Sequence, residues 1–522
     1  MSDLDEGNVN DAFLQKYLDG ENSKYISEII QVESDKQLSN LICEKQDSSV
    51  KKVKKKKDQV NFKYNSIPKS GKKIKSRKEI IEKIEDVSVL DSINPTITMS
   101  NLKQPNYNIG VTGMVSEGKS TLTYAVTGQA TQRSRVEMER NITMKVGYAD
   151  SEIWNIDGKY VSRGFNKELI DSECKDSDKK CHVSFVDCPG HFSLIKNMLS
   201  SVGMMHAVIV VVSVEGNNLL NKTSLIQHLR TIKLSGIKDI IVCLNKIDLI
   251  KDDRDKITQK YEELKRLLED MEIEISYPII PTVFQLNIGT DILLDAICYL
   301  YSRREHHGDN YFLSNRSFDI NKTGTNYKKM LGACVGGSLI GGELMVGDEI
   351  EIKPGLIVNN DYVPIRTTIT SLKYNRYDLD RIVPGGLISI GTNLVPSIAA
   401  KNPKNDRDGL AGKLLGKVGE LPPVYKTLVL GDIKTNIFDY DWTPEVDEKE
   451  KITVQFENQM RISVLQDISE ERSEYTFKLK SGPMCIGVGK RVVLMKISDS
   501  SLNILGYGTL VRGVDMLEEG KV

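Results

Sequence analysis

The sequence lacks paired cysteines, long apolar runs and a strong net charge. Its eight cysteines are scattered singly with no CxxC pair, which argues against a disulfide framework and a zinc ribbon and favours a reducing compartment. The most apolar run, Ala207–Val214, is far too short to span a bilayer. The first residues also lack the basic and apolar regions of a signal peptide. We therefore expect a cytoplasmic protein without a membrane partner.

The net charge of −1 over 522 residues hides an uneven distribution. Residues 1–50 carry eleven acids against four bases, and residues 51–78 carry thirteen bases against one acid. Because large apolar residues in periodic order are scarce there, we expect residues 1–100 to be a disordered, charged extension. The lysine tract at residues 51–57 is consistent with a solvated tail, with RNA or ribosome contact, or with nuclear import.

From Tyr107 onward, short apolar runs alternate with helical patterns. Strands are predicted at residues 107–111, 183–186, 208–212 and 240–244, and helices at 120–126, 193–200, 223–233 and 256–271. This alternation indicates a parallel α/β sheet. After about residue 304, alternating stretches with frequent glycine are typical of β-structure. We predict an α/β domain at residues 101–308, followed by two small all-β barrels at residues 309–415 and 416–522.

The stretch from Gly113 to Ser120 (GMVSEGKS) fits G-x-x-x-x-G-K-[ST] and lies between a predicted strand and a predicted helix. In this motif the glycines let backbone N–H groups wrap around phosphates. Lys119 is expected to reach the β- and γ-phosphates, and the Ser120 hydroxyl is expected to ligate Mg²⁺. Glu117 places a carboxylate beside this anion site, so it is expected either to point outward or to weaken nucleotide affinity.

Two further motifs follow predicted strands. In Asp187-Cys188-Pro189-Gly190, the Asp187 carboxylate can bind Mg²⁺ through a water molecule. The Gly190 N–H can donate a hydrogen bond to a γ-phosphate. In Asn245-Lys246-Ile247-Asp248, the Asp248 carboxylate can accept both the N1–H and the N2–H₂ donors of guanine, a pair that adenine does not offer. Three such motifs in order on successive strand ends predict a P-loop GTPase domain that binds GTP or GDP with Mg²⁺.

With these motifs the chain resembles the translational GTPases, and most closely the gamma subunit of eukaryotic and archaeal translation initiation factor two. Residues Glu139–Ala149 (ERNITMKVGYA) are similar to that family's first switch, and Asn141 stands where elongation factors typically carry glycine. The resemblance implies that Thr143 closes over the γ-phosphate and Mg²⁺ and that His191 orients the attacking water. It also implies that Tyr148 lies near the pocket for the methionyl end of initiator tRNA.

The chain also departs from the family pattern. Val283-Phe284 stands where the family has Ser-Ala, a contact made chiefly by a backbone N–H to the guanine oxygen. Only Cys174 and Cys181 stand in the interval where family members often carry a zinc knuckle, so no zinc is expected. Met495-Lys496-Ile497 replaces a Ser-Arg-Arg that would help to hold tRNA.

The site residues expected from the motifs and the resemblance fall into three groups. The catalytic residues are His191, Thr143 and Lys119, and the metal ligands are Ser120, Thr143 and Asp187. The nucleotide-binding residues are Gly113, Ser116, Glu117, Gly118, Lys119, Ser120, Thr121, Asp187, Gly190, Asn245, Lys246, Asp248, Val283, Phe284 and Gln285.

The leading hypothesis is a GTPase that delivers methionyl initiator tRNA to the small ribosomal subunit, with GTP hydrolysis as the release switch. The resemblance implies as partners the alpha and beta subunits of a heterotrimer, a guanine-nucleotide exchange factor and a GTPase-activating factor. Two alternatives remain open. One is an elongation-type GTPase for another aminoacyl-tRNA, and the other is a divergent GTP-binding scaffold or regulator with little turnover.

Overall fold

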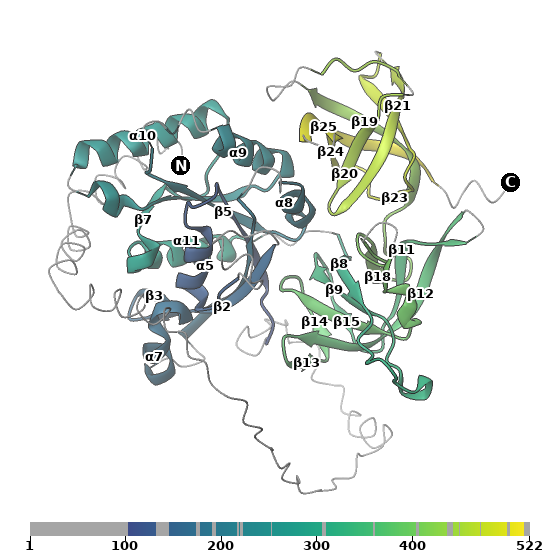
Figure 1. The fold of residues 1–522 in the computed structure, drawn as a ribbon, viewed down its shortest axis with the longest axis horizontal. Coiled ribbons are helices and arrows are strands. Elements are labelled where there is room, and N and C mark those ends of the chain that lie inside the picture. The colour runs from purple at the N-terminus through teal and green to yellow at the C-terminus, as the bar shows by residue number, and fades with distance from the viewer. Residues whose placement is uncertain are drawn as a thin grey trace, which may run out of the picture. The chain divides into compact units, whose positions relative to one another are not determined.

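The computed structural model of the chain describes residues 103–131, 146–173, 178–190, 195–216, 219, 223–251, 253–304, 309–358, 361–402, 407–435, 442–447, 449–469, 471–497 and 502–515. The extension expected at residues 1–100 lies outside these residues. Within them, an α/β domain is followed by two β-barrels (Figure 1). None of the described helices is long and apolar enough to cross a membrane.

A mixed, seven-stranded sheet forms the centre of the α/β domain, in the order β3-β2-β4-β1-β5-β6-β7. Its strands are β1 (Tyr107–Thr112), β2 (Gly147–Ile156), β3 (Lys159–Ser162), β4 (Lys179–Asp187), β5 (Ala207–Ser213), β6 (Asp239–Asn245) and β7 (Ile280–Thr282). The run from β4 through β1, β5 and β6 to β7 is parallel. The side chains on both faces of β1 and β5 are buried, which explains their nearly continuous apolar sequences.

The strands β2 and β3 were not predicted from the sequence, and they make the sheet mixed. β2 runs antiparallel to β4 and forms a hairpin with β3. The two loop residues, Asp157 and Gly158, have φ values of 48° and 85°, and a type I′ hairpin turn requires positive φ at both positions. The Asp-Gly pair is the sequence signal for this hairpin, which was not among the predicted elements.

Helices cover both sides of the sheet (Figure 1). They are α5 (Lys119–Thr127), α7 (Arg163–Glu173), α8 (Ile195–Val202), α9 (Thr223–Ser235), α10 (Arg254–Asp270) and α11 (Thr290–Ser302), with 3₁₀ turns η4 (Ile247–Ile250) and η5 (Phe284–Leu286). α5 and α11 share one core with β1, which includes Leu122, Ile297 and Ile109. The helices predicted at residues 120–126, 223–233 and 256–271 are confirmed as α5, α9 and α10.

The second domain is a β-barrel with its own apolar core. Its strands are β8 (Phe312–Phe318), β9 (Cys334–Leu339), β10 (Leu344–Met345), β11 (Glu349–Val358), β12 (Asp361–Tyr374), β13 (Tyr377–Leu379), β14 (Arg381–Ile382), β15 (Ile388–Thr392), β16 (Lys401–Asn402), β17 (Arg407–Asp408) and β18 (Leu414–Lys417), with η6 (Tyr327–Lys329) and η7 (Pro396–Ile398). The sheet runs β11-β18-β8-β9-β15-β12-β13, and pairing of β11 with β12 closes it. Closure removes the exposed strand edges of an open sheet.

The third domain is a second barrel built in the same way, around the core residues Leu428, Val454 and Leu494. Its strands are β19 (Val424–Thr435), β20 (Ile452–Phe456), β21 (Gln459–Ser469), β22 (Glu474–Leu479), β23 (Met484–Cys485), β24 (Arg491–Ile497) and β25 (Leu502–Asp515). The sheet runs β22-β21-β20-β24-β25-β19-β23, and pairing of β19 with β22 closes it. The predicted order of one α/β domain and two β-barrels is confirmed.

Candidate nucleotide-binding site

The loop from Gly113 to Gly118 joins the end of β1 to the start of α5 at the carboxyl edge of the sheet. Gly113 and Gly118 have φ values of 141° and 104°. A Cβ on Gly113 would lie 2.3 Å from Val211 O, and a Cβ on Gly118 would lie 2.3 Å from Asn245 Nδ2. Both positions therefore require glycine. An α-helix leaves its first N–H groups without intrahelical acceptors, so this loop and the start of α5 offer donors to an anion.

Lys119, the first residue of α5, is buried and turns back toward the loop. Its Nζ donates to Met114 O at 2.5 Å. Burial lowers the pKa of Lys119, whereas Asp187 and Glu117 favour its charged form. Gly190 lies close by, because a Cβ there would be 2.4 Å from Lys119 Nζ. An ammonium group held between the phosphate loop and the Gly190 turn is suited to a polyphosphate.

Glu117 turns its carboxylate inward, not outward as one of the two sequence expectations had it. The carboxylate accepts a hydrogen bond from the backbone N–H of Ser213, the last residue of β5. The Glu117 carbonyl accepts from Asn245 Nδ2 at 2.8 Å, and the residue is only 5% exposed. Glu117 thus joins the phosphate loop to the ends of β5 and β6. Its effect on nucleotide affinity stays a prediction.

Two residues expected to hold magnesium, Ser120 and Asp187, are brought together. Ser120 Oγ donates to Asp187 Oδ2 at 2.8 Å, and Thr131 Oγ1 donates to the same oxygen at 2.5 Å. Hydroxyl and carboxylate oxygens are the ligands that Mg²⁺ prefers, so this donor set fits the ion. Thr131 belongs to no recognisable motif, so its place beside Asp187 could not be predicted from the sequence.

The predicted base-reading motif lies at the end of β6. Asn245 is buried and links several segments: its Nδ2 donates to the phosphate loop, and its Oδ1 lies 3.4 Å from both Thr282 Oγ1 and Phe284 N. Lys246 adopts a φ of 63°, and its Nζ pairs with Glu215 at 2.8 Å. Asp248 Oδ1 is buried and, among the described residues, has no hydrogen-bond partner. A buried carboxylate oxygen of this kind suits a ligand with N–H donors, such as guanine.

Val283, Phe284 and Gln285 follow β7 and form the start of η5. The Phe284 side chain is 1% exposed and belongs to the core that α5 and α11 share with the sheet. Its backbone N–H still faces Asn245, whereas Gln285 is exposed. The large side chain is thus accommodated in the core, and the backbone donor stays beside the base-reading motif.

Of the remaining predicted site residues, some lie in the described part of the chain and others lie outside it. Ser116, with a φ of 66°, belongs to the phosphate loop, and Thr121 follows on α5. Thr143 and His191 lie outside the described residues. Tyr148 is half-buried on β2, and its hydroxyl accepts from Asn315 Nδ2 of the second domain at 2.9 Å. Burial raises its pKa. A role of Tyr148 in tRNA binding stays a prediction.

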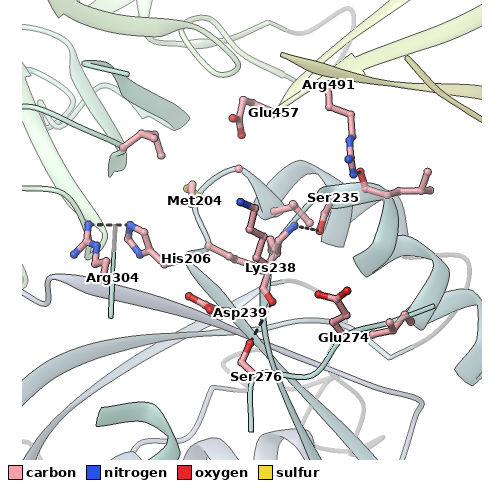
Figure 2. A pocket seen from close by; sticks show the side chains of 18 of the residues that line it. Met204, His206, Ser235, Lys238, Asp239, Glu274, Ser276, Arg304, Glu457 and Arg491 are labelled. Carbon is pink, nitrogen blue, oxygen red and sulfur yellow. Dashed lines mark hydrogen bonds between the residues drawn. The ribbon is translucent and has the colours of Figure 1, made fainter. Parts of the chain in front are cut away.

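A large pocket lies away from these motifs. It is lined by residues that precede β5 and start β6, among them His206 and Asp239, together with Arg304 and with Glu457 and Arg491 of the third domain (Figure 2). The nucleotide motifs lie instead at the carboxyl ends of β1, β4 and β6. In parallel α/β sheets, ligands bind at the carboxyl ends of the strands. The pocket is therefore distinct from the nucleotide site.

Comparisons with known proteins agree with this site. Residues 104–303 match the family described as the Elongation factor Tu GTP binding domain. The eukaryotic translation initiation factor 2 subunit gamma of Encephalitozoon cuniculi is 32% identical over 429 residues, which cover 79% of this chain and 94% of the relative. The translation initiation factor 2 subunit gamma of Haloarcula marismortui is 31% identical over 422 residues, which cover 79% of this chain and 100% of the relative.

Two solved structures are similar in fold. A bacterial selenocysteine-specific elongation factor, EF-Sec, has a TM-score of 0.59 and 22% identity, covering 78% of this chain and 59% of that one. The elongation factor SelB of Methanococcus maripaludis, in complex with the GTP analogue GppNHp, has a TM-score of 0.56 and 19% identity. It covers 80% of this chain and 81% of that one. At these identities the likeness establishes the fold alone.

A GTP-binding domain of the elongation factor Tu type, followed by two closed barrels, defines a translational GTPase. The extent and identity of the matches then specify the family. The chain belongs to the family of gamma subunits of eukaryotic and archaeal translation initiation factor 2, as a divergent member. It is a GTPase of translation initiation that binds guanine nucleotides.

Proposed function

We propose that the chain binds methionyl initiator tRNA in its GTP state and delivers it to the small ribosomal subunit, with GTP hydrolysis as the release switch. In this role it assembles with alpha and beta subunits and is served by a nucleotide-exchange factor and a GTPase-activating factor. The names of its relatives support a role as one subunit of an initiation factor.

The nucleotide chemistry of the proposal uses residues of the site described above. Ser120, Asp187 and Thr143 would hold Mg²⁺, which would neutralise charge on the phosphates. Lys119 and the phosphate loop bind the β- and γ-phosphates, and Asp248 reads the guanine base. His191 orients the attacking water. Catalysis then rests on positioning and charge stabilisation, without a covalent intermediate on the protein.

In this proposal, one set of contacts connects the Mg²⁺-binding residues of the GTP-binding domain to the second domain. Thr131 donates to Asp187, and Gly147 packs on Thr131, since a Cβ on Gly147 would lie 2.6 Å from Thr131 Cβ. The next residue, Tyr148, accepts a hydrogen bond from Asn315 of the second domain. A change at Asp187 therefore has a short physical route to the second domain, as a nucleotide-controlled tRNA site requires.

The experiment that tests the proposal is filter binding of methionyl initiator tRNA, with elongator methionyl-tRNA as competitor, in GTP analogue and in GDP. We expect initiator tRNA to bind at least about 10-fold more tightly in GTP analogue than in GDP. Preference for the elongator would favour the elongation-type alternative. Equal weak binding in both nucleotides would favour the scaffold alternative.

A matched pair of variants tests the route through Tyr148. Tyr148→Phe removes the hydroxyl that accepts from Asn315, and Tyr124→Phe removes a hydroxyl from a tyrosine that is 55% exposed on α5. We expect the first variant to reduce the GTP preference for initiator tRNA by about 3-fold or more and the second to leave it unchanged. Unchanged preference in both variants would exclude this route.

One observation favours the scaffold alternative. Met495, which stands at the serine of the family's Ser-Arg-Arg segment, is fully buried against Leu199 and Leu234 of the GTP-binding domain, and Ile497 replaces the second arginine with an apolar side chain. Met495 therefore serves domain packing here. Single-turnover GTP hydrolysis with the activating factor and the small ribosomal subunit distinguishes the two roles, because a scaffold shows no acceleration.

A further inference from the structure

His228 is a buried histidine on α9 that contacts two segments of the nucleotide site. The residue is 0% exposed. Its Nδ1 lies 3.1 Å from the hydroxyl of Thr112, the residue that precedes the phosphate loop. Its Nε2 lies 3.1 Å from the carbonyl oxygen of Gly190. One side chain from α9 therefore joins the end of β1 to the turn that follows β4.

These two contacts fix the tautomer of the His228 ring. A carbonyl oxygen only accepts hydrogen bonds, so Nε2 carries the proton that is donated to Gly190. Nδ1 then accepts from the Thr112 hydroxyl, and it is a stronger acceptor than Met198 Sδ, which lies 3.4 Å from the same hydroxyl. Burial lowers the pKa of His228 to about 4. The ring is therefore neutral near neutral pH and keeps one tautomer.

The Gly190 carbonyl belongs to the peptide bond that leads into His191. Holding this carbonyl therefore fixes the orientation of Gly190 in the turn that follows β4. Gly190 packs against the phosphate loop as well, since a Cβ there would lie 2.7 Å from Met114 C and 2.8 Å from Val115 N. The turn is thus held by the loop and by the imidazole together.

We infer that His228 is a positioning residue that holds Gly190 against the phosphate loop, so that the Gly190 N–H can reach the γ-phosphate and the site distinguishes GTP from GDP. This role rests on the proposed function, in which the Gly190 N–H contacts the γ-phosphate and His191 orients the attacking water. GDP has no γ-phosphate, so loss of the His228 contacts weakens GTP binding and hydrolysis but spares GDP binding. A packing role alone predicts that both affinities and the thermal stability fall together.

Three variants of the full-length chain separate these roles. His228→Leu keeps apolar volume and removes both hydrogen bonds of the ring. His228→Gln keeps an N–H donor that can reach the Gly190 carbonyl. Thr231→Val is the matched control, because Thr231 is also fully buried on α9 and its hydroxyl donates to Gln227 O at 2.8 Å within the same helix.

The readout is the ratio of GTP-analogue affinity to GDP affinity, from titrations with fluorescent nucleotides, together with single-turnover hydrolysis. For His228→Leu we expect the ratio and the hydrolysis rate each to fall about 10-fold or more. His228→Gln restores most of the ratio, and Thr231→Val leaves it unchanged. Equal losses for both nucleotides, or an unchanged ratio, would overturn the role of His228. Failure of the unmodified chain to bind GTP would instead overturn the proposed function.

Thr112→Val provides a second measurement in case His228→Leu does not fold. It leaves the ring and its Gly190 contact in place but removes the hydroxyl that donates to Nδ1 and holds the ring on its other side. We expect the GTP-to-GDP affinity ratio to fall about 3-fold, with GDP affinity retained. A ratio equal to that of the unmodified chain would count against the positioning role.

Discussion

The two ends of the central sheet both carry buried polar side chains, but they use them differently. At the carboxyl end, Asp187 and Asn245 contact the phosphate loop and α5. Gly113 and Gly118 leave no room for a Cβ, so the backbone segments approach each other closely. Asp248 Oδ1 is buried and, within the described part of the chain, is not satisfied by any protein donor. This end is the candidate nucleotide site.

At the amino end, the buried Asn108 side chain bonds to protein, whereas the Tyr107 hydroxyl is buried without a hydrogen-bond partner among the described residues. Asn108 Nδ2 donates to Met204 O at 2.8 Å and to Ser338 Oγ at 2.9 Å, and its Oδ1 accepts from Gly386 N at 2.7 Å. Ser338 and Gly386 belong to the second domain, and the Arg304 guanidinium lies over the Tyr107 ring. Buried polarity therefore does not mark a ligand site by itself. What distinguishes the carboxyl end is that its polar groups surround a glycine-dependent loop at the start of α5.

The largest expected effect comes from removing the ammonium group at the carboxyl end. Lys119→Ala should weaken GDP binding about 1000-fold, because charge-assisted bonds to the phosphates are lost. Thermal unfolding should change little, since burial already disfavours this charge. Titration with fluorescent GDP measures the effect. Lys233→Ala, at a half-buried lysine paired with Glu272, is the control. Tight GDP binding by the Lys119 variant would contradict the role of the phosphate loop.

The corresponding change at the amino end should affect stability alone. Asn108→Ala removes three buried hydrogen bonds and should lower the free energy of unfolding by about 3 kcal/mol. Nucleotide affinity should remain within about 2-fold. Asn155→Ala, at an exposed hairpin turn, should cost less than about 1 kcal/mol. A large loss of GDP affinity in the Asn108 variant would remove the distinction between the two ends.

The selectivity of the carboxyl end for guanine over other bases should depend on a single carboxylate, that of Asp248. Asp248→Asn should weaken guanine nucleotides about 100-fold and favour xanthine nucleotides, since the amide offers a donor where guanine needs a second acceptor. Competition between GDP and XDP measures the change. Asp253→Asn is the control, because Asp253 accepts from Lys256 N at 2.9 Å and caps α10. Unchanged guanine selectivity would refute the base-reading assignment.

Lowering the pH should decrease the free energy of unfolding, because His228 is buried in its neutral form beside the carboxyl end of the sheet. Burial lowers its pKa from 6.5 to about 4 in the folded chain. The unfolded chain therefore takes up a proton first as the pH falls, and stability decreases between about pH 6.5 and about pH 4. Between about pH 7 and about pH 5, His228 should lower the free energy of unfolding by about 2 kcal/mol. Urea unfolding of the unmodified chain and of His228→Gln isolates the contribution, and parallel pH profiles would rule it out.

The smallest expected effect concerns Thr131. Thr131→Val removes one of the hydroxyls that bond Asp187 Oδ2 and should weaken Mg²⁺ binding about 10-fold, because groups that orient a metal ligand typically contribute this much. Thr131→Ser should restore it. The Mg²⁺ dependence of GDP release measures the effect. An identical Mg²⁺ dependence in the valine variant and the unmodified chain would place Thr131 outside the metal site.

Much of the fold and part of the site were predictable because their signals are local. The phosphate loop needs glycine where φ is positive, at Gly113 and Gly118, and the apolar runs identify the strands on either side. Parallel strands bring their carboxyl ends to one edge, which collects Asp187 and Asn245. The hairpin at Asp157-Gly158 had an equally local signal, but its strands were not among those predicted.

The sequence by itself determined the class of domain, the phosphate loop and the guanine-type motif, because backbone conformation and strand burial depend on neighbouring residues. Only the tertiary structure decided the inward turn of Glu117 onto Ser213 and the bond from Thr131 to Asp187. It also decided the placement of His228 between Thr112 and Gly190. Each of these contacts joins residues at least 38 positions apart in the chain. A single hydroxyl, imidazole or backbone N–H acquires its role only when folding brings its partner within hydrogen-bonding distance.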